Sequence, residues 1–310
     1  MSFNWQNEIL DINSNIEINV DMRNHTYFKI GGTADAMVKP TTIEEMYNIY
    51  KWCLGNKVGI TVIGNGTNLL VSDKGIRGLV IKISDNLSNI QTSNNIIKAQ
   101  AGALLSSVAK VALNSSLTGF EFASGIPGTI GGAVYMNAGA YDGEMKDVVT
   151  KATVVSKEGS LEVWDKQRLA LDYRSSAVAK EEAIILDVEV SLNKGNYKEI
   201  LDRMSLLNRW RRERQPLDMP SAGSTFKRPP DVAGSYLIDK IGLKGYSIGG
   251  AQVSKKHAGF IVNKGGATAQ DVLDLMAYVQ KKVYEEEGVL LKPEVRFIGE
   301  VQKNKLLVKP

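Results

Sequence analysis

The sequence of 310 residues has few of the side chains that bind metals or form disulfides. It holds one cysteine, Cys53, and two histidines, His25 and His257. A single cysteine excludes an internal disulfide and fits a reducing compartment. So few cysteines and histidines disfavour a zinc or haem site, and no metal is expected.

Long apolar runs and signs of nucleic-acid binding are also missing. No apolar run approaches the ~20 residues that a membrane span needs. Residues 1–20 have neither the basic region nor the continuous apolar region of a signal peptide. A net charge of +4 is too small to indicate nucleic-acid binding, although it fits binding of anionic small molecules. An aromatic content of 7% gives little support to stacking on bases. We expect a cytoplasmic protein without membrane or nucleic-acid partners.

Residues 119–145 are the most unusual stretch, because glycines are interspersed with apolar residues. The sequence GFEFASGIPGTIGGAVYMNAGAYDGEM is too glycine-rich for a helix and too apolar for a flexible linker. Glycine lets a backbone approach a ligand closely, so the stretch favours wrapping around a flat or phosphorylated cofactor. A buried, turn-rich connection inside the core is the alternative.

A second glycine loop, Gly64–Asn68, directly follows a buried strand predicted at Ile60–Ile63. A strand at Ala34–Val38 and a helix capped by Thr42 and Glu45 precede it, which resembles a βαβ unit. GNGTNLL, however, has leucine in place of the third glycine of a dinucleotide-binding loop, and no helical pattern follows. Phosphate binding through successive N–H groups and a plain hairpin turn both stay open for this loop.

The rest of the chain mixes strands and helices without a repeat. Helical patterns occur at 103–117, 196–214 and 269–287, and strand patterns at 79–83, 96–101, 148–156, 160–164, 183–192 and 288–300. The last helix has a capping box, Thr268 with Asp271, and a glycine stop at Gly288. This mixture predicts an α+β fold rather than a doubly wound sheet.

No familiar catalytic motif accounts for the remaining polar residues. Ser224 lies in AGSTF rather than in a GxSxG nucleophile elbow, and the sequence has no Walker A motif. What remains are glycine loops, arginines suited to carboxylates and phosphates, and an acid, Glu294, on the late strand. The set favours a cofactor-dependent enzyme that acts on an anionic substrate, and it leaves the reaction open.

Five motifs follow one another along nearly the whole chain. They are GNGTNLL at 64–70, SGIPGTIGGAVYMNAGAY at 124–141, YRSS at 173–176, AGSTFKRP at 222–229 and LKPEVRFIG at 291–299. In this order they resemble the UDP-N-acetylenolpyruvoylglucosamine reductase (MurB) family, and the series from Ala233 to Asn263 is similar too. Each motif alone is weak, whereas their ordered co-occurrence is specific.

The resemblance implies an oxidoreductase of peptidoglycan precursor synthesis, and so a part in cell wall biogenesis, cell shape and cell division. NADPH would reduce non-covalent FAD, and hydride would pass to the enolpyruvyl group of a UDP-sugar to give UDP-N-acetylmuramate. The implied fold is an FAD-binding fold of the vanillyl-alcohol-oxidase (PCMH) type with a C-terminal α+β substrate-binding domain. We expect FAD-binding subdomains at 1–78, with 299–310 as a candidate completion, and at 79–195, then the substrate domain at 196–298, in a monomer.

The resemblance also implies roles for individual residues. Ser224 resembles the proton donor, Glu294 the acid that stabilises the enolate, and Arg174 its partner on the substrate carboxylate. Taken alone, the three also fit a turn serine, a solvated acid and a surface ion pair. The implied substrate contacts are Tyr173, Arg214, Lys227 and Arg228. The implied FAD contacts are Gly64, Asn65, Gly66, Thr67, Asn68, Gly125, Pro127, Gly128, Thr129, Gly132, Ala133, Asn137, Ala138 and Gly139.

Two departures and two alternatives accompany the resemblance. Arg228 stands where many members have asparagine, which leaves its role open. The short interval from Arg174 to Ser224 resembles a shorter class of the family that lacks a tyrosine-bearing loop. One alternative is another flavin enzyme of the same fold, such as an alcohol oxidase. The other is a non-enzymatic sugar-nucleotide or RNA-binding protein that uses the basic helix 203–214.

Overall fold

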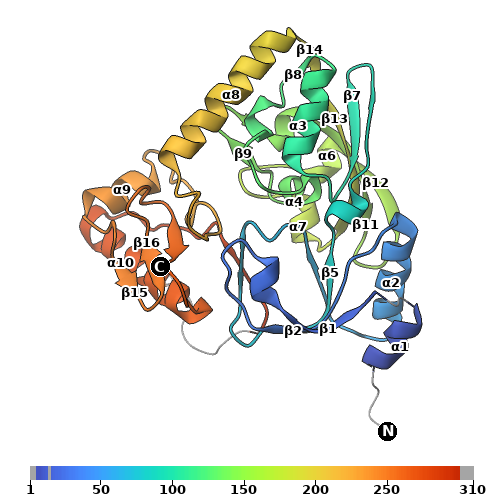
Figure 1. Ribbon diagram of the computed structural model, residues 1–310, viewed down its shortest axis with the longest axis horizontal. Helices are drawn as coiled ribbons and strands as arrows, with labels where there is room; N and C mark the ends of the chain where they lie inside the picture. The colour runs from blue at the N-terminus through green and yellow to red at the C-terminus, as the bar shows by residue number, and fades with distance from the viewer. Residues whose placement is uncertain (1–4, 13–14, 301–310) are drawn as a thin grey trace. The chain divides into compact units, whose positions relative to one another are not determined.

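The structure, a computed structural model, describes residues 5–12 and 15–300 and consists of two units (Figure 1). The first unit holds the described residues up to Glu17, together with 36–65 and 79–211. The second holds 18–35, 66–78 and 212–300. Each unit is therefore built from segments that are far apart in the sequence. Residues 299–310 are the segment expected from the sequence as a candidate completion of the first FAD-binding subdomain. Residues 301–310 of that segment lie outside the described residues.

A five-stranded antiparallel sheet is the main sheet of the first unit. Its order is β12-β11-β13-β7-β6, and the strands span Leu161–Asp165, Val149–Val155, Ile184–Ser191, Ile96–Gln100 and Ile90–Ser93. In the middle strand, Val188 pairs with Ala152 on one side and with Ala99 on the other. Four of these strands confirm the sequence prediction. The fifth, β6, has a mostly exposed burial pattern and gives no apolar signal in the sequence.

The stretch 119–145 contains a helix, so the prediction that it is too glycine-rich for one is wrong. Thr129 caps this helix, α4, by accepting the N–H of Gly132 at 3.4 Å. A Cβ on Gly131 would lie only 2.7 Å from the Cβ of Ala101, so close packing requires glycine there. The elements of the stretch are η3, Glu121–Ala123; α4, Ile130–Tyr135; β9, Gly139–Ala140; β10, Gly143–Glu144; and α5, Met145–Val148.

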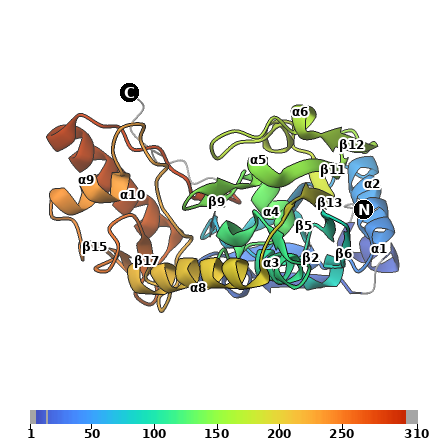
Figure 2. The same cartoon turned by 90° about the horizontal axis from the view of Figure 1, so that it is seen from above.

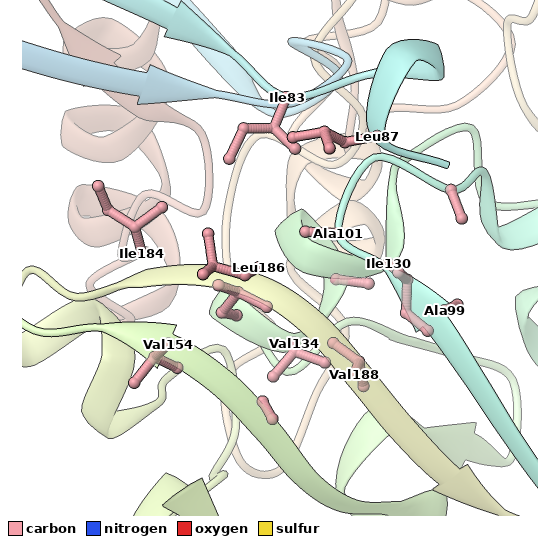
Figure 3. Close-up of a cluster of buried hydrophobic side chains, with 14 of the residues drawn as sticks. Ile83, Leu87, Ala99, Ala101, Ile130, Val134, Val154, Ile184, Leu186 and Val188 are labelled. Carbon is pink, nitrogen blue, oxygen red and sulfur yellow. The ribbon is translucent and has the colours of Figure 1, made fainter. Parts of the chain in front are cut away.

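Core packing accounts for this short helix. Figure 3 shows Ile130 and Val134 of α4 beside Leu186 and Val188 of β13, and all four side chains are buried. Burying an aliphatic side chain of this size contributes about 1.5–3 kcal/mol. Tertiary packing rather than helix propensity therefore keeps residues 130–135 helical.

A second sheet has the strand order β1-β2-β5-β3. These strands span Glu17–Asp21, Thr33–Val38, Ile76–Lys82 and Ile60–Ile63. Strands β3 and β5 are parallel, and Ile60 pairs with Leu79. The strands predicted at 34–38, 60–63 and 79–83 are thereby confirmed. Strand β4, Leu69–Val71, rather than a helix, follows the Gly64–Asn68 loop.

Helix α2, Ile43–Gly55, begins with a capping arrangement that differs partly from the predicted one. Thr42 accepts the N–H of Glu45 at 3.0 Å, as expected, but the Glu45 carboxylate accepts the N–H and hydroxyl of Thr41 rather than the N–H of Thr42. Cys53 is fully buried on this helix, which confirms it as a small core residue. Burial raises the pKa of its thiol to about 12.

The remaining elements of the first unit are mostly short. They include α1, Trp5–Ile12; η2, Asp85–Leu87; α3, Leu105–Asn114; β8, Leu117–Thr118; α6, Lys166–Leu169; α7, Ala177–Lys180; β14, Asn193–Lys194; and α8, Tyr197–Arg214, which runs into the second unit. Helices α3 and α8 confirm the patterns at 103–117 and 196–214. In the part of the chain that the structure describes, no helix is long and apolar enough to cross a membrane.

The second unit packs two helices on a small antiparallel sheet. Figure 2 shows α9, Gly234–Lys240, and α10, Ala269–Glu287, side by side. Their buried side chains, among them Leu237 and Val279, join one apolar core with Val253 of the sheet. The other elements are η1, Met22–His25; β4, Leu69–Val71; β15, Ser247–Ile248; β16, Ala251–Val253; β17, Ile261–Asn263; and β18, Arg296–Ile298.

The C-terminal elements confirm the predicted helix and correct the predicted strand. Thr268 and Asp271 form the capping box of α10, and Gly288 ends the helix with a left-handed φ of 67°. The strand predicted over 288–300 is limited to β18, which pairs in parallel with β4. Glu294 therefore precedes the strand instead of lying on it. Neighbouring Pro293 has no N–H for a continuous ladder and forms only an isolated bridge.

Candidate functional site

In the first unit the two glycine loops touch each other. A Cβ on Gly64 would lie 2.5 Å from Oγ1 of Thr129, so no side chain fits between them. The side-chain amide of Asn65 donates to the carbonyl of Pro127 at 3.0 Å. The fold thereby brings together two glycine loops about 60 residues apart. Glycines in such loops let a ligand approach backbone N–H groups closely.

Arg174 is tied to the end of the glycine-rich stretch. Its guanidinium donates to the carbonyls of Asn137 at 3.3 Å and of Gly139 at 3.2 Å. It also lies over the ring of Tyr173, with the guanidinium carbon 5.0 Å from the ring centre. The backbone φ of Arg174 is 51°, a left-handed conformation that arginine rarely adopts. Strain of this kind is a common feature of functional sites.

The side chain of Asn137 makes hydrogen bonds that hold the end of the glycine-rich stretch in place. Its fully buried side chain donates to the Glu144 carboxylate and to the carbonyl of Asp172, each at 2.9 Å. It accepts the N–H of Lys146 at 2.8 Å. These bonds join Asn137 to the end of the glycine-rich stretch, to Lys146 directly after it and to the segment just before Arg174. The side chain of Asn137 therefore acts as an internal brace.

Helix α8 adds two side chains that the sequence did not indicate as site residues. A Cβ on Gly125 would lie 2.5 Å from Oδ1 of Asn208 and 3.2 Å from Cδ of Arg211. Asn208 also donates to the hydroxyl of Ser124 at 3.2 Å. Burial lowers the pKa of the Arg211 guanidinium, but an arginine still carries its charge at neutral pH. In the sequence, the spacing of positions 208 and 211 by about one helical turn indicates that both side chains lie on the same face of the helix.

In the second unit Ser224 and Glu294 lie on neighbouring segments. The carbonyl of Thr225 accepts the N–H of Glu294 at 2.9 Å, and Phe226 and Pro293 form an isolated antiparallel bridge. Ser224 is exposed, and Glu294 is half-buried. The structure therefore brings together these two predicted residues, which are 70 positions apart in the sequence.

The second half of the Gly64–Asn68 loop reaches the same place within the second unit. The side-chain amide of Asn68 donates to the carbonyl of Glu294 at 3.2 Å, and the carbonyl of Asn68 accepts the N–H of Arg296 at 3.0 Å. Gly66 has a φ of 67°, and a Cβ there would lie 2.2 Å from the carbonyl oxygen of His25. Asn68 therefore fixes the main chain on both sides of position 295.

The other predicted residues are placed as follows. Arg214 and Arg228 are exposed, and Lys227 is half-buried, with its N–H bonded to the carbonyl of Lys292 at 2.8 Å. Arg174 belongs to the first unit, whereas Ser224 belongs to the second. The predicted FAD contacts in the first unit are Gly64, Asn65, Gly125, Pro127, Gly128, Thr129, Gly132, Ala133, Asn137, Ala138 and Gly139; Gly66, Thr67 and Asn68 are in the second. No group of three or more His, Cys, Asp and Glu over positions 5–12 and 15–300 forms a potential metal site.

Two family models match this chain in sequence order. Residues 34–164 match an FAD-binding domain, and residues 215–298 match the C-terminal domain of UDP-N-acetylenolpyruvoylglucosamine reductase. The first match covers both glycine loops, and the second covers Ser224 and Glu294. The expected FAD cofactor is confirmed.

Individual relatives agree over nearly the full length. The chain is 52% identical over 283 residues to the UDP-N-acetylenolpyruvoylglucosamine reductase of Caldanaerobacter subterraneus subsp. tengcongensis, covering 91% of this chain and 93% of the relative. It is 50% identical over 299 residues to that of Clostridium botulinum strain Hall, covering 96% and 97%. The crystal structure of the Thermus caldophilus enzyme superposes with a TM-score of 0.78 at 34% identity, covering 91% and 99%. The expected fold, an FAD-binding fold followed by a C-terminal α+β domain, is confirmed.

Proposed function

We propose that this chain, which belongs to the UDP-N-acetylenolpyruvoylglucosamine reductase family, reduces UDP-N-acetylglucosamine enolpyruvate to UDP-N-acetylmuramate with NADPH as the reductant. The chain is an FAD-dependent oxidoreductase. The observation that carries the proposed reaction is the hydrogen bond between Thr225 and Glu294, which holds the Ser224 loop beside that acid. The product is a precursor of peptidoglycan, so the proposal places the chain in cell wall synthesis.

Glycine-rich loops of this kind suit a dinucleotide cofactor, because their main chain can approach phosphate groups closely. At Gly64 and Gly125 a Cβ would lie 2.5 Å from a neighbouring side-chain oxygen, so glycine is required there for the loops to pack. We assign FAD binding to the two loops, with Gly64 and Asn65 from one and Gly125 to Gly139 from the other. When bound, non-covalent FAD supplies the hydride that NADPH delivers.

Ser224 is the proposed proton donor to the substrate carbon. A serine hydroxyl is a weak acid, so donation depends on a fixed position close to a strongly basic carbon. Three backbone contacts supply that fixation: Thr225 donates its N–H to the carbonyl of Gly259 at 2.8 Å and accepts N–H groups of the segment that begins at Glu294. The exposure of Ser224 leaves its hydroxyl accessible to a substrate.

Glu294 and Arg174 are assigned to the carboxylate end of the enolpyruvyl group. A planar guanidinium pairs with a carboxylate at two points, and its charge stabilises the negative charge that spreads there during the reaction. Attachment of Arg174 to the carbonyls of Asn137 and Gly139 restricts its rotation, which lowers the entropy cost of holding the substrate. Glu294 is assigned the stabilisation of the enolate.

The remaining assignments concern the sugar nucleotide and the state of the protein. Arg214, Lys227 and Arg228 have the charge to bind the diphosphate, and Tyr173 lies next to Arg174 to complete the carboxylate contact. We further propose a cytoplasmic monomer with FAD-binding subdomains at 1–78 and 79–195 and a substrate domain at 196–298.

The proposed function is tested with the purified protein. Its absorbance spectrum should have flavin bands, and NADPH with the enolpyruvyl substrate should give UDP-N-acetylmuramate, detected by mass spectrometry. A matched reaction with NADH tests the choice of nicotinamide. Turnover of simple alcohols with release of peroxide and no need for NADPH would instead favour the alcohol-oxidase alternative.

A further inference from the structure

A half-buried histidine outside the proposed reaction, His257, contacts the support of Ser224. It lies in the turn 254–260 that joins β16 to β17. Its Nδ1 accepts the N–H of Gly259 at 3.1 Å, and the carbonyl of Gly259 accepts the N–H of Thr225 at 2.8 Å. That N–H belongs to the peptide bond between Ser224 and Thr225. One residue therefore separates the imidazole from the peptide that carries Ser224.

The same series of bonds continues to Glu294. The carbonyl of Thr225 accepts the N–H of Glu294 at 2.9 Å, and Oγ1 of Thr225 accepts the N–H of Ile261 at 2.9 Å. Thr225 is only 2% exposed. Hydrogen bonds shielded from water in this way are stronger and more directional than exposed ones. Hydrogen bonds through Gly259 and Thr225 therefore connect His257 with both the Ser224 peptide and Glu294.

The turn fixes the position of the imidazole ring. The hydroxyl of Ser254 accepts the N–H of Lys256 at 3.1 Å and that of His257 at 3.2 Å. The ring packs edge-on against Phe260, with centroids 5.0 Å apart. A Cβ on Gly259 would lie 3.0 Å from Cε1 of the ring, so a residue larger than glycine at position 259 would press against the imidazole. Only a neutral imidazole with its proton on Nε2 accepts a hydrogen bond at Nδ1.

We propose that neutral His257 is a positioning residue that holds Ser224 and Glu294 in place through Gly259 and Thr225. Protonation would turn Nδ1 into a donor that faces the N–H of Gly259, and the first bond of the series would be lost. The turn 254–260 would then shift, and Ser224 with it. This inference rests on the proposed roles of Ser224 and Glu294 in the reaction.

The surroundings keep the imidazole neutral at neutral pH. Burial lowers the pKa of His257 below the usual histidine value, a hydrogen bond with its own backbone opposes this shift, Lys244 lowers the pKa further, and Asp239 raises it. Lys244 and Asp239, from the end of α9 and the turn after it, form an ion pair of 2.6 Å. On the turn itself the exposed Lys256 donates to the carbonyl of Arg212 at 2.7 Å. The net lowering of the pKa favours the neutral form of His257.

Two substitutions test the inference with purified holoenzyme. His257→Asn places an amide oxygen near the position of Nδ1 without a titrating group, and His257→Leu removes the acceptor. The Leu variant should slow consumption of the enolpyruvyl substrate by about tenfold to a hundredfold while leaving NADPH oxidation in the first half-reaction unchanged. The Asn variant should consume the enolpyruvyl substrate at about the wild-type rate. The plot of this rate against pH should lack, in the Asn variant, the acidic step that the wild type shows. His25→Asn is the matched control and should keep that step.

A measurement without substrate complements the kinetics. The amide signals of Gly259 and Thr225 in NMR spectra should shift with the same midpoint as the imidazole of His257, and these shifts should vanish in His257→Asn. Amides that stay unchanged through that titration, or an Asn variant that keeps the acidic step, would overturn the inference. If His257→Leu fails to fold, the Asn variant and the NMR titration decide. A wild-type protein that makes no UDP-N-acetylmuramate would overturn the proposed function instead, since the NMR result does not depend on it.

Discussion

Ser224 and Thr225 are adjacent residues with hydroxyl groups, and removing each hydroxyl should affect a different property, the reaction rate in one case and the stability of the fold in the other. Ser224 is exposed, and its hydroxyl makes no hydrogen bond to another residue of the described chain. Thr225 is 2% exposed, and its Oγ1 accepts the buried N–H of Ile261 at 2.9 Å. We therefore expect Ser224→Ala to impair the reaction without affecting the fold, and Thr225→Val to destabilise the fold.

The expected magnitudes separate the two variants. Ser224→Ala should change the free energy of unfolding by no more than about 0.5 kcal/mol. Loss of a general acid should slow the step that protonates the substrate by about 10²- to 10⁴-fold, or roughly 3–5 kcal/mol of activation free energy. Thr225→Val keeps the side-chain shape but leaves the N–H of Ile261 unsatisfied, which should cost about 1–3 kcal/mol of stability.

Stopped-flow absorbance and urea denaturation measure these effects separately. Flavin bleaching by NADPH and its recovery with the enolpyruvyl substrate report the two half-reactions, and Ser224→Ala should slow only the second. If Ser224→Ala slows both half-reactions equally, the role of Ser224 as proton donor is wrong. A urea midpoint in Thr225→Val equal to that of the wild type would refute the account of the buried bond.

Three further predictions concern the cofactor bed and the stability of each unit. Gly64→Ala should weaken FAD affinity about tenfold or more, because its Cβ would lie 2.5 Å from Thr129, whereas Gly55→Ala, with open space around it, should retain flavin in the same absorbance titration. Burial raises the pKa of the Cys53 thiol from 9.0, its usual value in an unfolded chain, to about 12. The stability that the protonated thiol contributes is therefore complete below the lower value and is lost as the pH rises toward the higher one. Denaturation between those values should show this loss in the wild type, at up to about 1.4 kcal/mol per pH unit, and Cys53→Ala should lack it; parallel curves would contradict the assignment. Asp73→Ala should cost about 1–2 kcal/mol in urea denaturation because Asp73 accepts two N–H groups at the start of α10, at 2.7 and 3.0 Å, and an unchanged midpoint would show that solvent replaces these bonds.

Local signals in the sequence predicted much of the fold. The strand Ile60–Ile63 and the capping box of Thr268 and Asp271 are encoded within a few consecutive residues, and both form as predicted. The same local reasoning failed for α4, because a helix with glycines at positions 131 and 132 depends on packing against Ala101 and β13. It also misplaced the last strand, since the strand partner of Arg296 is Leu69, which lies more than 200 positions earlier.

The sequence by itself determined the family, the cofactor and the list of candidate site residues, because these depend on which residue types occur in each motif and on the order of the motifs along the chain. The tertiary structure decided what those residues contact. It joined Gly64 to Thr129, Ser224 to Glu294 through Thr225, and Asn208 of α8 to the glycine-rich stretch, contacts between residues 65 to 83 positions apart. It also connected His257, which lies in the series from Ala233 to Asn263 but received no role from the sequence, to the Ser224 peptide through Gly259. Such contacts depend on the packing of the whole chain, which no local pattern of side chains specifies.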